Sequence, residues 1–282
     1  MDQGEGQDVP RQRNVSLLVT SVWFARQRQM TDLEGGMVVN EHTSAWIPAQ
    51  VPLLALESCQ TIFNHSRMPL QMRAATDADT DAIARLATIA FDPATDAIAR
   101  NLFPKRLQPA VPRLEDPAIA WRRTRKGLKM HTERIILMVV TDDELDDQIV
   151  GFSMWEEPLP DGQQGESMTK GLVPCETLDE EAYQELRCAS GAATNESLGK
   201  DGSNHMWYLD YLGVDPGQQR RGIGKMLLEW GMEKAREQNR DAFLIATPAG
   251  IPLYLAAGFE SLGSFMLFDT PHSCMIKRRP EP

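Results

Sequence analysis

The sequence predicts a mixed α/β fold in which helices flank a central sheet. Two runs of β-branched and apolar residues, 134–140 and 148–155, are separated by an acidic turn and predict a β-hairpin. Residues 206–214 predict a strand that runs into a glycine-containing loop and then into a helix. Strands and helices continue to alternate as far as residue 277, which favours one mixed sheet.

The other elements are expected in chain order from residue 70. A first strand covers 70–75, and a helix begins near Thr76, because Thr and Asp side chains can cap the free N–H groups of a first turn. A proline-broken region at 104–117, with a short helix, precedes a helix at 118–130 that is basic on one side. The later elements are a helix within 178–188, a helix at 219–238, a strand at 242–247, a short helix at 252–257, and an antiparallel pair at 259–268 and 273–277.

Residues 1–68 show no lasting helical or strand period, and we expect a poorly ordered N-terminal extension there. The 282-residue chain is long enough for one large domain with extensions. We therefore predict one domain at 69–282, interrupted by an acidic insertion at 158–204.

The net charge of −11 argues against a nucleic-acid binder, because phosphate contacts need clustered lysines and arginines. Residues 156–201 carry much of this charge, with eleven acidic and three basic residues. A solvated acidic loop is the expected explanation, while attraction of a cationic substrate stays open.

The cysteines and the apolar runs suggest neither a metal site nor a membrane anchor. The four cysteines form no Cys-x-x-Cys pair and have no histidine at ligand spacing. The apolar run Val15–Ala25 is shorter than the roughly 20 residues that span a bilayer. Acidic residues precede this run, which suits neither a signal peptide nor a presequence, so we expect the cytoplasm, or alternatively the nucleus.

The segment 210–225 contains the most informative pattern. A strand ends, a tight loop follows and a helix begins, so the first N–H groups of the helix point outward with partial positive charge. Gly222 and Gly224 have no side chain that would keep a phosphate at a distance. Such a turn is an anion site, and three cations lie beside it in the sequence: Arg220, Arg221 and Lys225.

The spacing of this loop differs from two common phosphate-binding motifs. Gln219-x-x-Gly222-x-Gly224 lacks the Gly-x-x-x-x-Gly-Lys-Ser/Thr spacing of a P-loop. It also lacks the Gly-x-Gly-x-x-Gly fingerprint that follows the first strand of a Rossmann fold. A nucleotide-phosphate binder of another fold is therefore disfavoured.

The pattern resembles the central motif of the GNAT superfamily of acetyl-CoA-dependent N-acetyltransferases. There, Gln/Arg-x-x-Gly-x-Gly/Ala follows a strand of the Leu-x-Val-x-Pro type, and this chain has Leu212-Gly213-Val214-Asp215-Pro216 and then Gln219-Arg220-Arg221-Gly222-Ile223-Gly224. The later Leu253-Tyr254-x-x-x-Gly258-Phe259 resembles the end of the family's short fourth helix. The resemblance extends over residues 70–279 and is dense over 206–259.

The resemblance implies a GNAT fold with acetyl-CoA as cosubstrate. In the family, loop amides hold the pyrophosphate, and the main chain of the strand bonds the pantetheine arm. Thr247 stands where many relatives have Asn at the start of the later motif, and its hydroxyl can still bond the cofactor arm. No metal is expected. The expected cofactor-binding residues are Leu212, Gly213, Val214, Gln219, Arg220, Arg221, Gly222, Ile223, Gly224, Lys225 and Thr247.

Acyl transfer to an amine needs a group that accepts the proton of the ammonium. Asp210 is the only carboxylate or imidazole between Met206 and Val214, and it can accept a proton directly or through water. Alternatively, it caps a neighbouring segment or binds the substrate ammonium. Alternation along a strand predicts Asp210 on the face of Tyr208 and opposite Tyr211. Several family members have Glu or His at the positions of Tyr208 and Asp210, so Tyr at 208 is a departure.

The reaction also needs a proton for the departing thiolate. In the family, the tyrosine that matches Tyr254 lies near the sulfur and acts as general acid. A phenol with a pKa near ~10 suits this role. The alternative is a tyrosine that only packs between helix and sheet.

These features predict an N-acetyltransferase that acts on a primary amine of a small molecule or a protein. The alternative is a GNAT-fold module that binds acetyl-CoA or CoA without catalysis. Asp210 and Tyr254 favour the enzyme, because a binding module needs neither.

Overall fold

The computed structural model describes residues 69–111, 113–161, 173–200 and 202–280. All of them belong to the second of the two units into which the chain divides, Asn64–Pro282. The strands are β1 (Leu70–Ala74), β2 (Ile135–Asp142), β3 (Gln148–Glu156), β4 (Trp207–Val214), β5 (Ala242–Ala246), β6 (Glu260–Leu267) and β7 (Thr270–Lys277). The α-helices are α1 (Thr80–Ala90), α2 (Ala97–Leu102), α3 (Pro117–Met130), α4 (Glu180–Leu198), α5 (Ile223–Glu237) and α6 (Ile251–Ala256).

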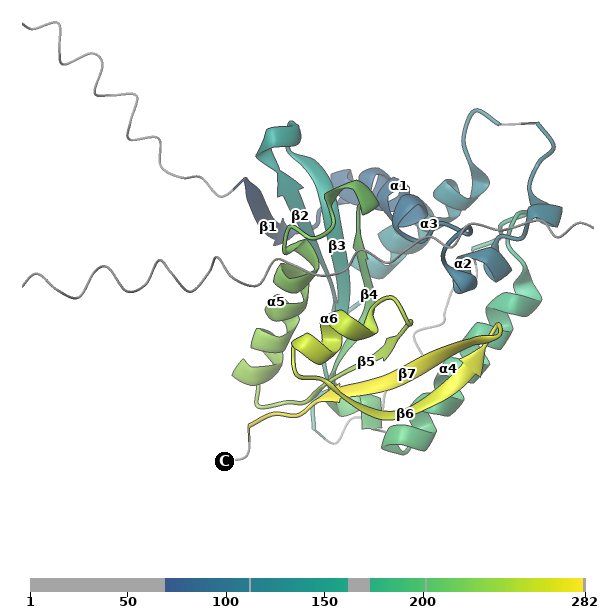
Figure 1. Ribbon diagram of the computed structural model, residues 1–282. Coiled ribbons are helices and arrows are strands. Elements are labelled where there is room, and N and C mark those ends of the chain that lie inside the picture. The colour runs from purple at the N-terminus through teal and green to yellow at the C-terminus, as the bar shows by residue number, and fades with distance from the viewer. Residues whose placement is uncertain (1–68, 112, 162–172, 201, 281–282) are drawn as a thin grey trace, which may run out of the picture. The chain divides into compact units, whose positions relative to one another are not determined.

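The strands form one seven-stranded sheet with the order β1-β2-β3-β4-β5-β7-β6 (Figure 1). Only the β4–β5 pair is parallel, and the other neighbours are antiparallel. The parallel pair is possible because α5 carries the chain back between the two strands. The predicted mixed sheet with flanking helices is confirmed.

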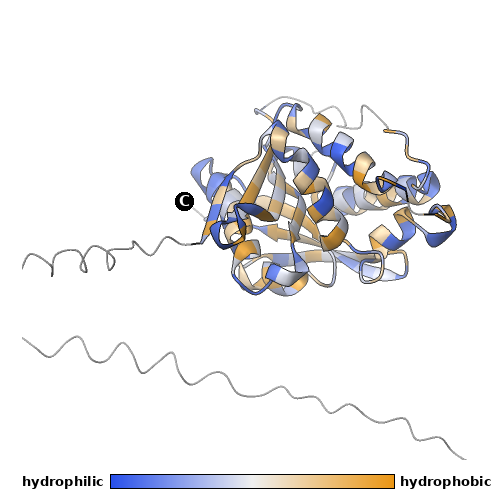
Figure 2. Ribbon diagram, turned by 90° about the horizontal axis from the view of Figure 1, so that it is seen from above, coloured by the Kyte–Doolittle hydropathy of each residue, from blue (hydrophilic) through white to orange (hydrophobic). Residues whose placement is uncertain are grey.

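Helices cover both faces of the sheet. On one face, Ile83 and Leu86 of α1 pack on Val139 and Phe152. On the other face, Leu227 of α5 packs on β2 and β3 in one hydrophobic cluster. Figure 2 shows apolar strands surrounded by helices that alternate between polar and apolar residues, as expected for helices with one face on a sheet.

Two irregularities of β4 open the centre of the sheet. Tyr211 pairs with Met154 of β3 and Leu209 pairs with Trp155, so Asp210 has no partner residue and lies in a β-bulge. On the other edge, β5 pairs with β4 only from Trp207 to Leu209, although β4 continues to Val214. Within the described residues, the second half of β4 therefore lacks a strand neighbour on the β5 side.

The bulge overturns the expected alternation along β4. Tyr211 was expected on the face opposite Asp210, yet it packs with Phe91, which caps the end of α1, and lies on the same side as Lys129 and Asp210. An extra residue in a bulge shifts all later side chains to the other face. The register of β3 against β4 fixes this shift, and the sequence of β4 alone does not reveal it.

Several element boundaries differ from the prediction. The helix expected at 219–238 begins only at Ile223, because Arg220 and Gly222 have positive φ angles of 67° and 86°. The closing strand β7 begins at Thr270 rather than 273, and α2 was not predicted. The region 104–117 contains a 3-10 turn, Lys105–Leu107, as the predicted short helix.

The expected acidic loop is also corrected where the structure describes it. Residues 180–198 form the 19-residue helix α4, longer than the expected 178–188 and packed along β6 and β7. Four carboxylates of the acidic stretch pair with arginines from elsewhere in the chain, namely Glu156, Asp161, Glu176 and Asp179. The expected extension at 1–68 lies outside the described residues.

Candidate active site

The predicted phosphate loop connects β4 to α5. After Val214 the chain makes a 3-10 turn, Pro216–Gln218, and then reaches Gly222, which caps α5 with a left-handed backbone at φ 86°. Gly222 has open space where a Cβ atom would stand, so its positive φ is the reason for glycine. The first-turn N–H groups of α5 thus begin at an open, side-chain-free position, as an anion site requires.

The three cations beside this loop differ in their partners and exposure. Arg221 forms an ion pair with the buried carboxylate of Asp142, at the end of β2, and also donates to Gln218. Lys225 pairs with Glu229 at 3.4 Å, while Arg220 is exposed. Arg221 therefore anchors the loop to the sheet through Asp142.

Close packing holds the loop against β4 and α6. A Cβ atom at Gly224 would lie 3.3 Å from Leu253 and 3.7 Å from both Leu212 and Val214. Ile223 is buried in the core, and Gln219 is exposed. Because its side chain is buried, Ile223 can offer only its main chain to a ligand.

A cavity of about 190 Å³ lies where β4 and β5 separate. Its wall includes both predicted catalytic residues, Asp210 and Tyr254, and two predicted cofactor residues, Leu212 and Thr247. The remaining wall comes from β3, α1, α2, α3 and α4. Residues 219–225 of the phosphate loop do not line it, so the loop and the cavity form two parts of the predicted site.

Tyr254 is held rigidly at one side of this cavity. It is only 8% exposed and packs edge-to-face on Phe259, with ring centroids 6.0 Å apart. Burial raises its pKa to about 12. The phenol therefore keeps its proton throughout the physiological range, so a proton donor is present in the cavity wall.

Asp210 lies in the bulge of β4, partly exposed to the cavity. Its carboxylate pairs with Lys129 of α3, with Nζ and Oδ2 3.3 Å apart. A substrate amine that approaches Asp210 must share the carboxylate with Lys129 or displace it. The predicted neighbour Tyr208 stacks on Phe243, 6.0 Å between centroids, and does not line the cavity.

The site contains basic residues that the sequence prediction did not assign to it. Arg122, Arg125, Lys126 and Lys129 of α3 all line the cavity. Their spacing of i, i+3, i+4 and i+7 places them on one face of a helix. The basic side of this helix was visible in the sequence, but a charged helix face is normally expected to point to solvent.

Trp155 and Trp207 are fully buried in the core. In the described part of the chain, no three His, Cys, Asp or Glu residues are grouped so that they could hold a metal ion. No helix there has the length and hydropathy needed to cross a membrane.

Comparison with known proteins places the chain in a family. Residues 99–259 match the model of the acetyltransferase (GNAT) family, more than half of the chain. The chain therefore belongs to the GNAT acetyltransferase family, and its seven-stranded mixed sheet with flanking helices is the GNAT fold.

A protein named acetyltransferase from Stachybotrys chartarum is 26% identical over 148 residues, which cover 50% of this chain and 62% of that protein. The match thus spans less than two thirds of the relative's length. A histone acetyltransferase HPA2 and related acetyltransferase structure from Corynebacterium glutamicum is 22% identical, with a TM-score of 0.47, covering 76% of this chain and 99% of that one. The yncA protein of Salmonella typhimurium, determined with its cofactor acetyl-CoA, is 16% identical, with a TM-score of 0.43 and coverages of 76% and 96%.

Proposed function

We propose that the protein transfers an acetyl group from acetyl-CoA to a primary amine of a small molecule or a protein. One observation carries this proposal: a single cavity is lined by Tyr254, Thr247 and Asp210. A proton donor and a proton acceptor thus face the same space, as amine acylation requires.

The residues around the cavity fit a coenzyme A thioester. The main chain of β4 beyond Leu209 has no strand partner on the β5 side among the described residues, so its polar groups can bond the pantetheine arm. Beyond that arm, the Gly222 turn and the start of α5 offer main-chain donors for the pyrophosphate. These two features succeed one another along the chain, from Leu212 to Gly224, as an extended ligand needs.

The chemistry assigns one proton transfer to each catalytic residue. When bound, the thioester supplies the acetyl group, which forms a bond to the amine nitrogen as its carbon–sulfur bond breaks. Asp210 takes the proton that the ammonium must lose, directly or through water. Tyr254 gives its proton to the sulfur and recovers one from solvent. The nitrogen loses a second proton as the amide forms, which offsets the one that Tyr254 takes from solvent, and Asp210 releases its proton to solvent. The overall products are therefore an amide, free coenzyme A and one proton, with the enzyme unchanged.

Two measurements on the wild-type protein test the proposal. Acetyl-CoA should raise the melting temperature, because a ligand that binds only the folded state stabilises it. Thiol release with acetyl-CoA should then appear with at least one member of an amine panel, and mass spectrometry should find that amine heavier by one acetyl group. Stabilisation without any acetylated product across small amines and protein lysines would instead favour a non-catalytic acetyl-CoA-binding module.

A further inference from the structure

The inner face of α3 gives the cavity an excess of positive charge. Four basic residues of this helix line it, and among the described residues the only acidic ones in its wall are Asp96 and Asp210. The Asp96 carboxylate caps α2 by accepting from the Ala99 N–H at 2.6 Å, and the Asp210 carboxylate pairs with Lys129. Three basic residues of the wall therefore pair with no carboxylate among the described residues and can bind an anionic ligand: Arg122, Arg125 and Lys126.

Arg122 and Lys126 are buried although neither forms an ion pair within the described part of the chain. Arg122 is 9% exposed and Lys126 is 6% exposed. Arg122 donates to the Thr88 hydroxyl at 3.3 Å, and no side-chain hydrogen bond of Lys126 occurs among the described residues. Buried charges are normally paired, because removing an unpaired charge from water is costly.

Aromatic rings hold these cations in place. The guanidinium of Arg122 lies 4.6 Å from the Phe103 ring centroid, and the ammonium of Lys126 lies 4.1 Å from that of Tyr211. Arg125 lies over Trp121 at 4.7 Å and donates to the hydroxyl of Tyr183. Ring faces compensate part of the desolvation of a cation, but they do not occupy all of its N–H donors.

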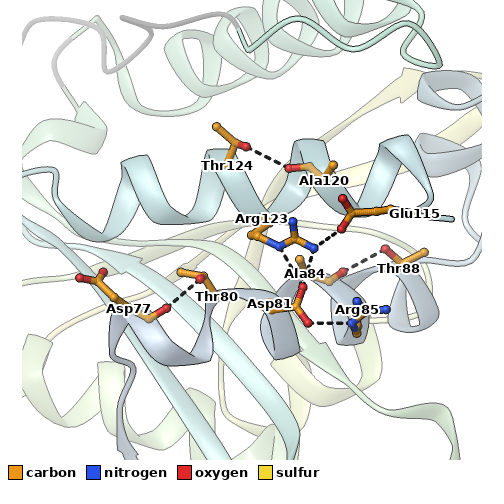
Figure 3. A network of polar contacts seen from close by, with 10 residues as sticks. All are labelled: Asp77, Thr80, Asp81, Ala84, Arg85, Thr88, Glu115, Ala120, Arg123 and Thr124. Carbon is orange, nitrogen blue, oxygen red and sulfur yellow. Dashed lines mark hydrogen bonds and ion pairs between the residues drawn. The ribbon is translucent and has the colours of Figure 1, made fainter.

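The outer face of the same helix provides the contrast (Figure 3). Arg123 donates to Asp81 of α1 at 2.9 and 2.5 Å and also to Glu115. Its neighbour in sequence, Arg122, lines the cavity, and no carboxylate among the described residues pairs with it. Arg123 on the solvent side of α3 thus has two acidic partners, whereas Lys129 is the one inner-face cation with a carboxylate partner among the described residues.

These cations are separate from the phosphate loop. They belong to α3, which packs on the α1 face of the sheet, whereas the loop begins α5 on the opposite face. Desolvation lowers the pKa of Lys126 to about 7 and lowers that of Arg122. An anion in the cavity would restore the charged form of Lys126, because opposite charges stabilise each other more strongly in a buried site.

We propose that the acceptor amine carries an anionic group, a carboxylate or a phosphate, which binds Arg122, Arg125 and Lys126 while the amine faces Asp210. This inference rests on the proposed function, since it names the acceptor class of the same site. Guanidinium groups suit it because they bind carboxylate and phosphate oxygens through paired N–H donors.

The experiment compares amines that differ only in the anionic group. The first arm pairs each proteinogenic amino acid with its decarboxylated amine, and the second pairs phosphoethanolamine with ethanolamine. We expect kcat/KM for thiol release to be at least about tenfold higher for the anionic member of the preferred pair, the effect of one lost charge-assisted contact. The arm that shows the preference identifies carboxylate or phosphate.

Two variants and one control test whether α3 causes the preference for anionic amines. Arg122→Met and Lys126→Met keep an apolar side chain of similar length and should bring the ratio between the paired amines close to one. Arg123→Met removes a cation from the outer face of the same helix and should leave the ratio unchanged. A preference that survives in both inner-face variants would overturn the inference.

A binding measurement keeps this inference separate from the proposed function. The same amines are added to the protein loaded with coenzyme A, and the melting temperature is measured, which requires no turnover. A larger rise with the anionic members supports the inference even if no thiol is released, a result that would defeat only the proposed activity. Equal or larger rises with the neutral-tailed amines, or no rise with any amine, would overturn the inference even in an active acetyltransferase.

Discussion

The two ends of the candidate site are built in different ways. The cofactor end comes from two short segments near each other in the sequence, 212–225 and 247–254, and offers mainly main-chain groups. The acceptor end is assembled from α1, α2, α3 and α4 and offers side chains. We therefore expect substitutions at the cofactor end to stop the reaction with every amine, and substitutions at the acceptor end to change only the choice of amine.

The largest effect is expected at the point where the two ends meet. Tyr254→Phe removes one hydroxyl and little volume, so folding and acetyl-CoA affinity should barely change. Turnover should fall by about 10²- to 10⁴-fold with every amine, the usual contribution of a general acid. Because burial raises the pKa of Tyr254 to about 12, wild-type turnover should not decline up to pH 10 through loss of this proton.

Tyr208→Phe is the matched control, because Tyr208 is half-buried, stacks on Phe243 and does not line the cavity. It should leave thiol release near the wild-type rate. Full turnover in Tyr254→Phe would defeat the acid assignment and require water or another group to protonate the sulfur.

Asp210→Asn should lower turnover by about 10²-fold if the carboxylate accepts the proton of the ammonium. The loss should shrink at high pH, where more of the amine is already neutral. Lys129→Met breaks the same ion pair but keeps the carboxylate, so its effect should be much smaller. Equal losses in the two variants, independent of pH, would show that the ion pair positions α3 and that Asp210 is not the base.

Gly222→Val should remove the stabilisation by acetyl-CoA, which is about 2.7 kcal/mol for a ligand at 100 times its Kd. The side chain would stand where the phosphate approaches, and the φ of 86° disfavours any β-branched residue. Gly199→Val imposes comparable backbone strain at φ 79° on the end of α4, far from the loop in sequence. The control should melt earlier but keep its full rise with acetyl-CoA, and a retained rise in Gly222→Val would place the pyrophosphate elsewhere.

The smallest effect concerns the pH dependence of folding at the acceptor end. Lys126 faces Asp210 and three cations, Arg122, Arg125 and Lys129, and its pKa is about 7 in the folded protein. The unfolded chain binds more protons at this site between pH 7 and about 10.4, so folding becomes more favourable as pH rises through that range. Relative to Lys126→Met, the wild-type free energy of unfolding should increase by up to about 1.4 kcal/mol per pH unit between pH 7 and 9. Parallel curves from denaturant titrations of the two proteins would contradict the buried, unpaired state of Lys126.

The strand, loop and helix of the proposed cofactor end were predicted well because their signals are local. A strand, a turn and a helix with glycines at fixed spacing are contiguous from Leu212 to Gly224, and the structure has them in that order. The predicted start of α5 was wrong because the positive φ of Arg220 delays the helix. A left-handed backbone at an arginine has no signal in the sequence.

The acceptor end was predicted poorly because it depends on contacts between distant segments. The bulge at Asp210 follows from how β3 pairs with β4, and this register moved Tyr211 to the face of α1 and α3. The basic side of α3 was recognised, but its inward direction depends on the aromatic rings of Phe103 and Tyr211 that receive the cations. No local pattern could distinguish this arrangement from a solvated helix face.

The most direct test of one continuous site is a crystal structure of the protein with acetyl-CoA. The pyrophosphate should lie on the main chain of Gly222–Gly224, and the pantetheine arm should run along β4 beyond Leu209. The thioester sulfur should then lie within hydrogen-bonding distance of the Tyr254 hydroxyl, at the edge of the cavity that contains Asp210. A cofactor bound elsewhere, or a thioester on the far side of α5 from this cavity, would contradict the account.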